Sequence, residues 1–399
     1  MTKKIINDPV HGFISIQDDL IFQIISHPIF QRLRRIKQMA LAYLVYPGAV
    51  HTRLHHALGA YHLITMAMEE LRQKGTEISD DEFRGAQVAI LLHDIGHGPF
   101  SHALEKTLLN VSHENISIRI MKKLNSELNG ALDIAISIFE NKYSKKFLHQ
   151  LISGQLDVDR LDYLARDSFF TGVSEGVIGY DRIIKMLVVK NDTLMVEEKG
   201  IHSIEKFLIA RRLMYWQVYL HKTVLSSEIM LVHILKRAKE ISFQNKPLFA
   251  TPSLHYFLTE KNIEFEKNDI ALEHFCLLDD HDIACCIKVW SKCDDEILSD
   301  LCNRLLNRNL FKIKFHSEKN KEEIENIKMQ FAEKYHQQNS LHYYYKESET
   351  QNLMYDEHET QINILFKNGE IKNIAEVDYS LIKGGMLVNE KRKFSCFGL

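Results

Sequence analysis

The chain has 399 residues, of which 45% are hydrophobic and 26% are charged, and its formal net charge is −3. This near-neutral balance gives no electrostatic case for general nucleic-acid binding, so a polyanion would have to be recognised in a local pocket. No stretch approaches the roughly 18 apolar residues of a membrane span, and the N-terminal segment has no signal-like apolar core. The six cysteines form no zinc-type CxxC repeat and are interpreted as free thiols, so we expect a cytoplasmic protein.

The first three quarters of the chain carry a helical pattern. Only 17 Gly and 6 Pro interrupt 399 residues, which favours long helices. Apolar residues recur at helical spacing in the segments 20–40, 55–73, 82–94, 111–125, 131–143, 204–240 and 295–307. Between two of these segments, residues 186–198 alternate about Asn191 and Asp192, which predicts an inserted β-hairpin.

The C-terminal segment has a different character. Short apolar runs at 310–316, 340–347 and 360–377 predict strands, the last divided by a turn at Asn368-Gly369. We therefore expect a mainly α fold with a large helical core over residues 1–312, which includes the hairpin, and a small α+β region over residues 313–399.

Titratable residues gather at the end of the apolar segment 82–94. Residues 91–102 read LLHDIGHGPFSH, and burying such groups without compensation costs several kcal/mol. If the helix continues, His93 and Asp94 point about 100° apart and His97 lies one turn beyond His93. Imidazole and carboxylate without thiolate suit a divalent Fe, Mn, Ni, Zn, Co or Mg ion. The remaining ligands would come from two other clusters: His51, His55 and His56, and Asp157, Asp159, Asp162 and Asp167.

A second His-Asp pair provides a comparison. His281-Asp282 has neither the GHGPFSH continuation nor a companion cluster. We interpret it as structural, with Asp279, Asp280 and Asp282 capping the N-terminus of a helix.

The order of His56, His93-Asp94 and Asp159 resembles the H…HD…D signature of the HD-domain phosphohydrolase superfamily. Longer strings resemble the branch that contains the sterile-alpha-motif HD-domain dNTP triphosphohydrolase and its bacterial dNTPase relatives. These strings include INDPVHGFI, FQRLRRIKQ, YPGAVHTRLHHALG, DVDRLDYLARD and IARRLMYWQVYLHK, in order from about residue 4 to about residue 315.

The resemblance implies a metal-dependent triphosphohydrolase. Its four metal ligands would be His56, His93, Asp94 and Asp159, with positions left open for water and a phosphate oxygen. Water would attack the α-phosphate, releasing deoxynucleoside and intact inorganic triphosphate. The phosphates would be bound by Arg53, His97, Arg160, Tyr163 and Arg211. Independently of the family, Arg160 directly follows Asp159 and Tyr163 lies one helical turn beyond it, which suits a cation and a hydroxyl beside a metal.

The resemblance also implies roles in proton transfer and sugar recognition. His102 matches the proposed general acid, with Glu105 three residues on, and His113-Glu114 matches a supporting pair. Gln38 and Asp167 match the residues near the sugar 3′-hydroxyl, Met39 would crowd a ribose 2′-hydroxyl, and Tyr219 would pack near sugar and base. Tyr215 replaces a family histidine, which leaves base preference open.

Two other functions stay open at this stage. The same metal site could hydrolyse a nucleoside mono- or diphosphate, a modified dNTP or a signalling nucleotide, or the chain could be a non-catalytic nucleotide sensor. Because relatives bind nucleotides at subunit interfaces, the resemblance implies a homo-oligomer, either a dimer or a tetramer.

Overall fold

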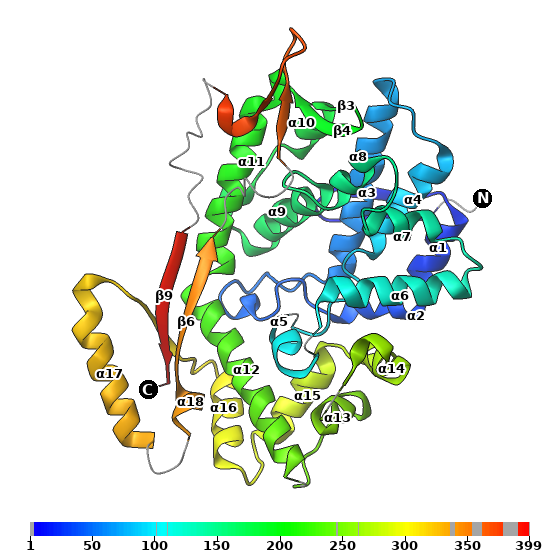
Figure 1. The fold of residues 1–399 in the computed structure, drawn as a ribbon. Helices are drawn as coiled ribbons and strands as arrows, with labels where there is room; N and C mark the ends of the chain where they lie inside the picture. Colours follow the sequence, from blue (N-terminus) through cyan, green and yellow to red (C-terminus); the bar gives the residue numbers. More distant parts are fainter. Residues whose placement is uncertain are drawn as a thin grey trace.

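The computed structural model describes residues 4–100, 102–109, 111–244, 246–261, 263–335, 340–352, 361–377 and 390–398. The predicted fold class is confirmed: a large helical core contains an inserted hairpin, and a smaller α+β part follows at the C-terminal end (Figure 1). Within the described residues, no helix is both long enough and apolar enough to cross a membrane.

The chain begins with an antiparallel hairpin of β1 (Lys4–Asp8) and β2 (Gly12–Ile16). Its turn is held by Asp8, whose Oδ1 accepts the N–H groups of Val10 and His11, both at 2.9 Å. This turn directs the His11 ring toward the interior, where its side chain is fully buried.

The continuous helix expected over residues 20–40 is wrong. The structure has α1 (Asp19–Ser26), α2 (Pro28–Gln31) and the 3₁₀ helix η1 (Arg32–Arg35) instead. Proline disfavours helical geometry in the residue before it, and His27 accordingly has extended dihedral angles, φ −67° and ψ 137°. Pro28 then occupies the first turn of a new helix, where its missing N–H carries no penalty.

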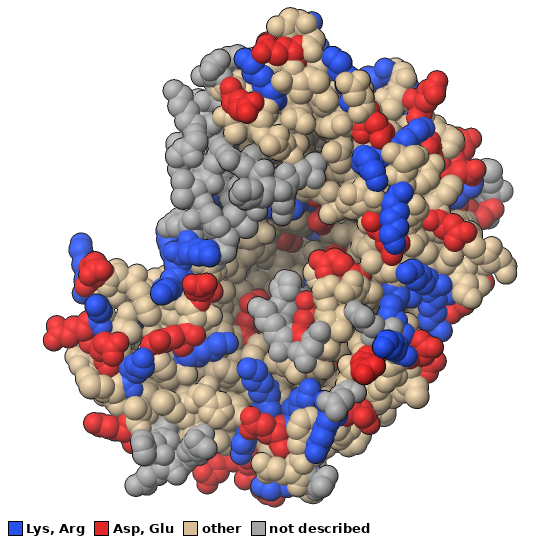
Figure 2. Space-filling model, in the orientation of Figure 1, with Lys and Arg blue, Asp and Glu red and all other residues tan. Residues whose placement is uncertain are grey.

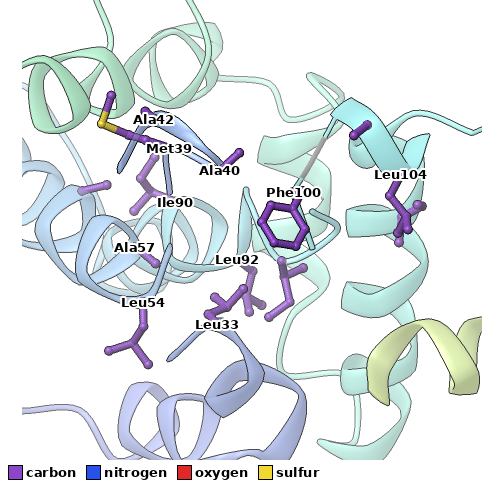
Figure 3. Packing of buried hydrophobic residues seen from close by; sticks show 14 of the residues in the cluster. Leu33, Met39, Ala40, Ala42, Leu54, Ala57, Ile90, Leu92, Phe100 and Leu104 are labelled. Atoms are coloured by element: carbon purple, nitrogen blue, oxygen red, sulfur yellow. The ribbon is translucent and has the colours of Figure 1, made fainter. Parts of the chain in front are cut away.

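Two helices at the centre of the core carry much of the apolar surface. They are α3 (Arg53–Gln73) and α4 (Asp80–Leu92), both in predicted segments. A capping box of Ser79 and Glu82 begins α4. Figure 3 shows Ile90 and Leu92 from this helix packed near Met39, Ala40 and Phe100. All five side chains are at most 8% exposed, so the loop before α3 and the loop after α4 are fixed against one apolar layer.

Further helices of the core follow along the chain. They are the 3₁₀ turn η2 (Ala42–Leu44), α5 (His102–Leu104), the π-helix η3 (Glu105–Leu109), α6 (His113–Glu127), α7 (Asp133–Phe139), α8 (Lys146–Ile152), α9 (Val158–Thr171), η4 (Ser174–Gly176), α10 (Tyr180–Lys185), η5 (Glu198–Gly200), α13 (Pro252–Thr259), η7 (Phe265–Lys267), α14 (Asp269–Leu277), α15 (Asp280–Trp290) and α16 (Glu296–Leu306).

Gly59 lets α9 approach α3 closely. A Cβ atom at this position would overlap the side chains of Asp162 and Arg166 on α9. Only glycine therefore allows the two helices to bring their polar side chains into one buried layer.

The predicted helical segment 204–240 is interrupted. It forms α11 (Ile201–Met214), the π-helix η6 (Tyr215–Tyr219) and α12 (Lys222–Phe243). The His221 ring accepts the Thr223 N–H at 3.2 Å and so begins α12 as a new helix. Short π-helices are frequent at functional sites, and η6 carries three of the aromatic residues discussed below.

The predicted hairpin over residues 186–198 is confirmed as β3 (Leu187–Lys190) and β4 (Thr193–Glu197). Asn191 and Asp192 have φ values of 52° and 58°, as a type I′ turn requires. The C-terminal strand β7 (Asn363–Leu365) adds in parallel to β4, and β8 (Ile371–Asn373) pairs with β7. The last two strands turn at Gly369, as predicted, so part of the C-terminal region completes a sheet that begins in the core.

A second C-terminal sheet has the order β5-β9-β6. Its strands are β5 (Lys312–Phe315), β6 (Tyr345–Asn352) and β9 (Glu390–Phe397), accompanied by η8 (Glu318–Asn320), α17 (Lys321–Tyr335), α18 (Leu341–Tyr344) and η10 (Ile374–Glu376). The strand predicted at 340–347 is wrong in its first half, which is the short helix α18. The division of the chain at residues 312 and 313 stays a prediction.

Candidate functional site

Side chains from α3, the end of α4 and α9 meet at one point. His56 Nε2 lies 3.3 Å from His93 Nε2 and 3.0 Å from Asp159 Oδ1, and His93 Nε2 lies 3.4 Å from the same oxygen. These three ligand atoms all lie within 4.8 Å of one another, and the group can hold a divalent metal ion.

The other nitrogens of the two rings show how well this group fits a metal. His56 Nδ1 lies 2.7 Å from Asp162 Oδ2, and His93 Nδ1 lies 2.6 Å from the Ile90 carbonyl oxygen. Because both partners are acceptors, each Nδ1 donates, and each neutral ring presents an Nε2 lone pair to the group. Two lone pairs 3.3 Å apart repel each other unless a cation lies between them. The donor set therefore fits a metal.

Protons compete with a metal ion for the ring nitrogens of His56 and His93. Burial lowers the pKa of His56, but the hydrogen bonds and charges of Asp159 and Asp162 outweigh this effect and raise the pKa to about 10. Burial also opposes protonation of His93, where Asp94 and Asp159 raise the pKa. A metal ion must displace these protons to bind, so its affinity depends on pH.

Asp94 lies between this group and a second cluster. Its Oδ1 is 3.4 Å from His93 Nε2 and 3.3 Å from His97 Nε2, and its Oδ2 accepts a hydrogen bond from Arg53. Burial raises the pKa of Asp94, but the charges of His93, His97 and Arg53 outweigh it and hold the pKa well below its usual range. This carboxylate stays ionised beside the proposed metal position.

The group has a buried polar support. Asp162 Oδ2 contacts His56, while Asp162 Oδ1 lies 2.6 Å from His11 Nε2 and 2.9 Å from Arg166 Nη2. Arg166 in turn donates to Asp8 at 2.7 Å. Burial raises the pKa of Asp162, and its partners outweigh this effect and lower the pKa well below the ordinary value. The Asp162 carboxylate therefore sets the tautomer and the orientation of the His56 ring.

We expect Asp162→Asn to reduce metal affinity about 10–100-fold, the usual effect of removing a charged partner from a metal-binding histidine. Competition with a chelator measures the affinity, and the melting temperature shows whether the fold survives. Asp181→Asn, at an exposed site on α10, is the control. Unchanged affinity in Asp162→Asn would contradict this role.

A second His/carboxylate group lies beside the first. His97 Nδ1 and His113 Nδ1 lie 3.5 and 3.4 Å from Glu105 Oε1, and the two rings stack with centroids 3.9 Å apart. Burial and Arg53 lower the pKa of His97, whereas in His113 Glu105 outweighs burial and raises it. Glu114 Oε1 lies 3.3 Å from His113 Nε2. The structure thus brings together three of the four predicted catalytic residues and His97.

His102 begins α5, but its side chain lies outside the part of the structure that is described. The next residue, Ala103, lines the cavity described below, so this turn borders the candidate site.

The expected helical continuation from His93 to His97 is wrong. α4 ends at Leu92, and residues 93–96 form turns. At Gly96 a Cβ atom would overlap backbone atoms of His113 and Ser117 on α6, and the Gly96 N–H donates to Ser117 Oγ at 2.9 Å. This close approach of the α6 backbone diverts the chain, so that His97 faces His113 across the site.

A cavity of about 690 Å³ adjoins the site. The cavity is lined by Arg53 and Tyr163, and also by the predicted sugar-binding residues Gln38, Asp167 and Tyr219. The volume lies within the range of roughly 300–1,000 Å³ that is typical of small-molecule sites. The face drawn in Figure 2 is hollowed near its centre, with basic and acidic side chains interspersed around the hollow.

Two further predicted phosphate-binding residues are the buried Arg211 and the partly buried Arg160. Arg211 is 6% exposed, and its Nε and one terminal nitrogen have no hydrogen-bond partner among the described residues. Its guanidinium carbon lies 6.0 Å from the centre of the Tyr215 ring, which lines the cavity. Arg160 donates to Asp157 at 3.2 Å. Burial raises the pKa of Tyr163, whereas the charges of Arg211 and Arg160 act to lower it.

The predicted sugar-binding residues form a polar layer in the cavity. Asp167 accepts a hydrogen bond from the Tyr219 hydroxyl at 2.7 Å, and its other oxygen lies 2.7 Å from His51 Nε2. Gln38 Oε1 is buried and has no partner among the described residues. Met39 is 8% exposed and also lines the cavity.

Several residues contribute to the site in ways that the sequence did not indicate. Asp162 was one of four open metal candidates, and the structure places it behind His56 instead. His11, in the string INDPVHGFI, supports the Asp162 carboxylate. The only sequence signal for this role was a histidine placed between turn residues. Strand β6 also reaches the cavity, although its sequence carries no catalytic pattern.

The pair at His281 is structural as expected: Asp279 and Asp282 form a capping box. Asp280 is not a cap, because it accepts the Lys37 N–H at 3.0 Å.

Family models match two parts of the chain. One, described as HD domain, matches residues 53–167, and another, described as HD associated region, matches residues 178–249. The first match begins at Arg53 and ends at Asp167, so it spans the whole His56, His93 and Asp159 group.

Individual relatives extend this similarity. The chain is 34% identical over 390 residues to the YwfO protein of Bacillus subtilis (strain 168), covering 94% of this chain and 87% of that protein. It is 30% identical to the deoxynucleoside triphosphate triphosphohydrolase SAMHD1 homolog of Dictyostelium discoideum, covering 60% of this chain and 50% of that protein. Among solved structures, it is similar to a phosphohydrolase from Bacteroides thetaiotaomicron VPI-5482, with a TM-score of 0.94, 50% identity and coverage of 99% and 100% of the two chains.

Proposed function

This chain belongs to the HD-domain phosphohydrolases, and on that premise we propose that it hydrolyses deoxynucleoside triphosphates to deoxynucleoside and inorganic triphosphate. The observation that carries the proposal is the buried Arg211, whose Nε and one terminal nitrogen have no hydrogen-bond partner among the described residues. Its guanidinium lies beside Tyr215, which lines the same cavity as the predicted sugar-binding residues. Leaving guanidinium donors buried without acceptors is costly, and a phosphate chain supplies the acceptors.

The proposed metal ligands are His56, His93, Asp94 and Asp159. A divalent ion bound there polarises a phosphate oxygen and lowers the pKa of a bound water. Arg53, Arg160 and Arg211 would neutralise the negative charge of the triphosphate, with His97 and Tyr163 as further donors. The relatives that act on deoxynucleoside triphosphates share 30% identity with this chain, which supports the same substrate class.

Proton transfer would complete the reaction. When the α-phosphorus is attacked by water, the bond to the 5′-oxygen breaks and that oxygen must receive a proton. His102 would donate it, because histidine has an ordinary pKa near 6.5 and can act as an acid near neutrality. His113, Glu105 and Glu114 would support the hydrogen-bond network beside it.

Analysis of the released phosphate tests the proposal. The four dNTPs and four rNTPs are incubated with Mn, Fe, Mg or Ni, and the phosphate species are separated. Inorganic triphosphate with a deoxynucleoside is the expected product. Orthophosphate or pyrophosphate would instead point to another HD phosphohydrolase reaction, and metal binding without turnover would point to a sensor. A homo-oligomer, dimer or tetramer, stays a prediction.

Met39→Ala is expected to weaken the preference for deoxyribose. Removing this buried side chain from the cavity wall makes room for a 2′-hydroxyl, and a steric effect of this size is worth about 10–200-fold in specificity. The ratio of kcat/KM for GTP and dGTP measures it. Met195→Ala is a matched control, since Met195 is also buried, at 5% exposure, but lies in the hairpin. An unchanged ratio in Met39→Ala would exclude this role.

A further inference from the structure

One face of the C-terminal sheet β5-β9-β6 is turned toward the core. In the antiparallel pair of β6 and β9, Ser348 lies opposite Phe394 and Thr350 lies opposite Arg392, so each pair points to the same face. The Arg392 guanidinium carbon lies 3.9 Å from the centre of the Trp216 ring in η6. Phe394 is 2% exposed. In Figure 1, β6 and β9 accordingly run beside the green helices that carry η6.

The other face of the sheet is covered by α17. Phe331 on this helix lies 6.2 Å from the Tyr345 ring and 6.0 Å from the Phe397 ring, measured between centroids. Lys328 on the same helix lies 3.3 Å from the Glu347 carboxylate. The alternation along β6 therefore separates Tyr345 and Glu347, on the α17 side, from Ser348 and Thr350, on the core side.

The core-facing residues of β6 reach the proposed substrate cavity. Lys346, Ser348 and Thr350 line the same cavity as Arg53 and Asp167. Helix α12 completes this wall with Glu228 and Lys236, which also line the cavity. One cavity is thus lined both by residues that we propose to bind phosphate and sugar and by this wall of the C-terminal sheet and α12.

We infer that this wall, and Lys346, Ser348 and Thr350 of β6 in particular, recognises the polar edge of the substrate's base. The inference rests on the proposed function, because it extends the dNTP site along its own cavity. The triphosphate and deoxyribose are common to all four dNTPs, so residues that bind them cannot distinguish one base from another. Bases differ in where their edges place donors and acceptors, and ammonium and hydroxyl groups can read these differences.

Kinetics with all four dNTPs test the inference. The wild type is expected to prefer some bases over others. In Lys346→Met, the KM of the preferred dNTP should rise about 10-fold or more, since hydrogen bonds to a charged group are lost. Its kcat should stay within about twofold, because the contact is present in both ground and transition states. The spread of kcat/KM among the dNTPs should narrow. Thr350→Val provides a milder second variant if Lys346→Met folds poorly.

Glu347→Gln is the matched control, because Glu347 belongs to the same strand but faces α17. Equal kcat/KM for the four dNTPs in the wild type would overturn the inference. So would a loss in Lys346→Met that is the same for every base, or the same loss in Glu347→Gln.

A binding measurement separates this inference from the proposed function. The four dNTPs are titrated into metal-free wild type, Lys346→Met and Glu347→Gln in EDTA. If the wild type hydrolyses no dNTP, the proposed function fails. Base-dependent affinity that is lost only in Lys346→Met would still support base recognition by this wall. Base-independent affinity in all three proteins would refute it.

Discussion

His93→Ala is expected to abolish metal binding and to reduce turnover by more than about 10³-fold, because the ion contributes several kcal/mol of transition-state stabilisation. The ring is one of three side chains whose ligand atoms converge, and its Nε2 lies 3.4 Å from Asp159 Oδ1. Asp94→Ala is expected to have the same effect. Bound metal is measured by elemental analysis and turnover by released triphosphate.

The fold is expected to survive this change. His93 follows the last residue of α4, and its side chain is 9% exposed. Most of the helical circular dichroism should therefore remain. His281→Ala is the control, since that histidine is also followed by an aspartate but lies exposed in the cap of α15. Wild-type turnover in His93→Ala would rule out the proposed metal site.

The second large effect is expected for His102→Ala, which should lower kcat about 10²–10⁴-fold while metal and nucleotide still bind. Phe100, two residues before His102, has φ 50°, and its N–H donates to Asp280 at 3.3 Å. The adjacent Ala103 lines the cavity, so α5 begins beside the proposed substrate site.

The pH–rate profile distinguishes an acid from a residue that only supports the structure. The alkaline limb of kcat/KM reports the pKa of the acid in the free enzyme, so this limb should disappear in His102→Ala. His113→Ala is the comparison. Its pKa is raised because Glu105 outweighs burial, and its loss should shift the limb rather than remove it. If His113→Ala removes the limb and His102→Ala keeps it, the acid has been assigned to the wrong histidine.

Local sequence signals predicted most helices and both hairpin turns of the four-stranded sheet β3-β4-β7-β8. Helical spacing over residues 82–94 predicted α4, and Asn191-Asp192 predicted the hairpin, because periodicity and turn chemistry depend on neighbouring residues alone. The same reasoning failed at Pro28 and at 340–347. Pro28 ends one helix and begins another, which apolar spacing alone does not show. The aromatic run at 340–347 suits either a helix or a strand.

By itself, the sequence determined which segments are helical, which residue types suit a metal, and, through its resemblance, which residues to expect in one site. Only the tertiary structure decided how they meet. The close approach of α6 at Gly96 turns His97 toward His113, and the close approach of α9 at Gly59 places Asp162 behind His56. Strand β6 reaches the cavity through its pairing with β9. Such contacts between different elements leave no periodic trace in either segment, because they depend on the packing of the whole chain.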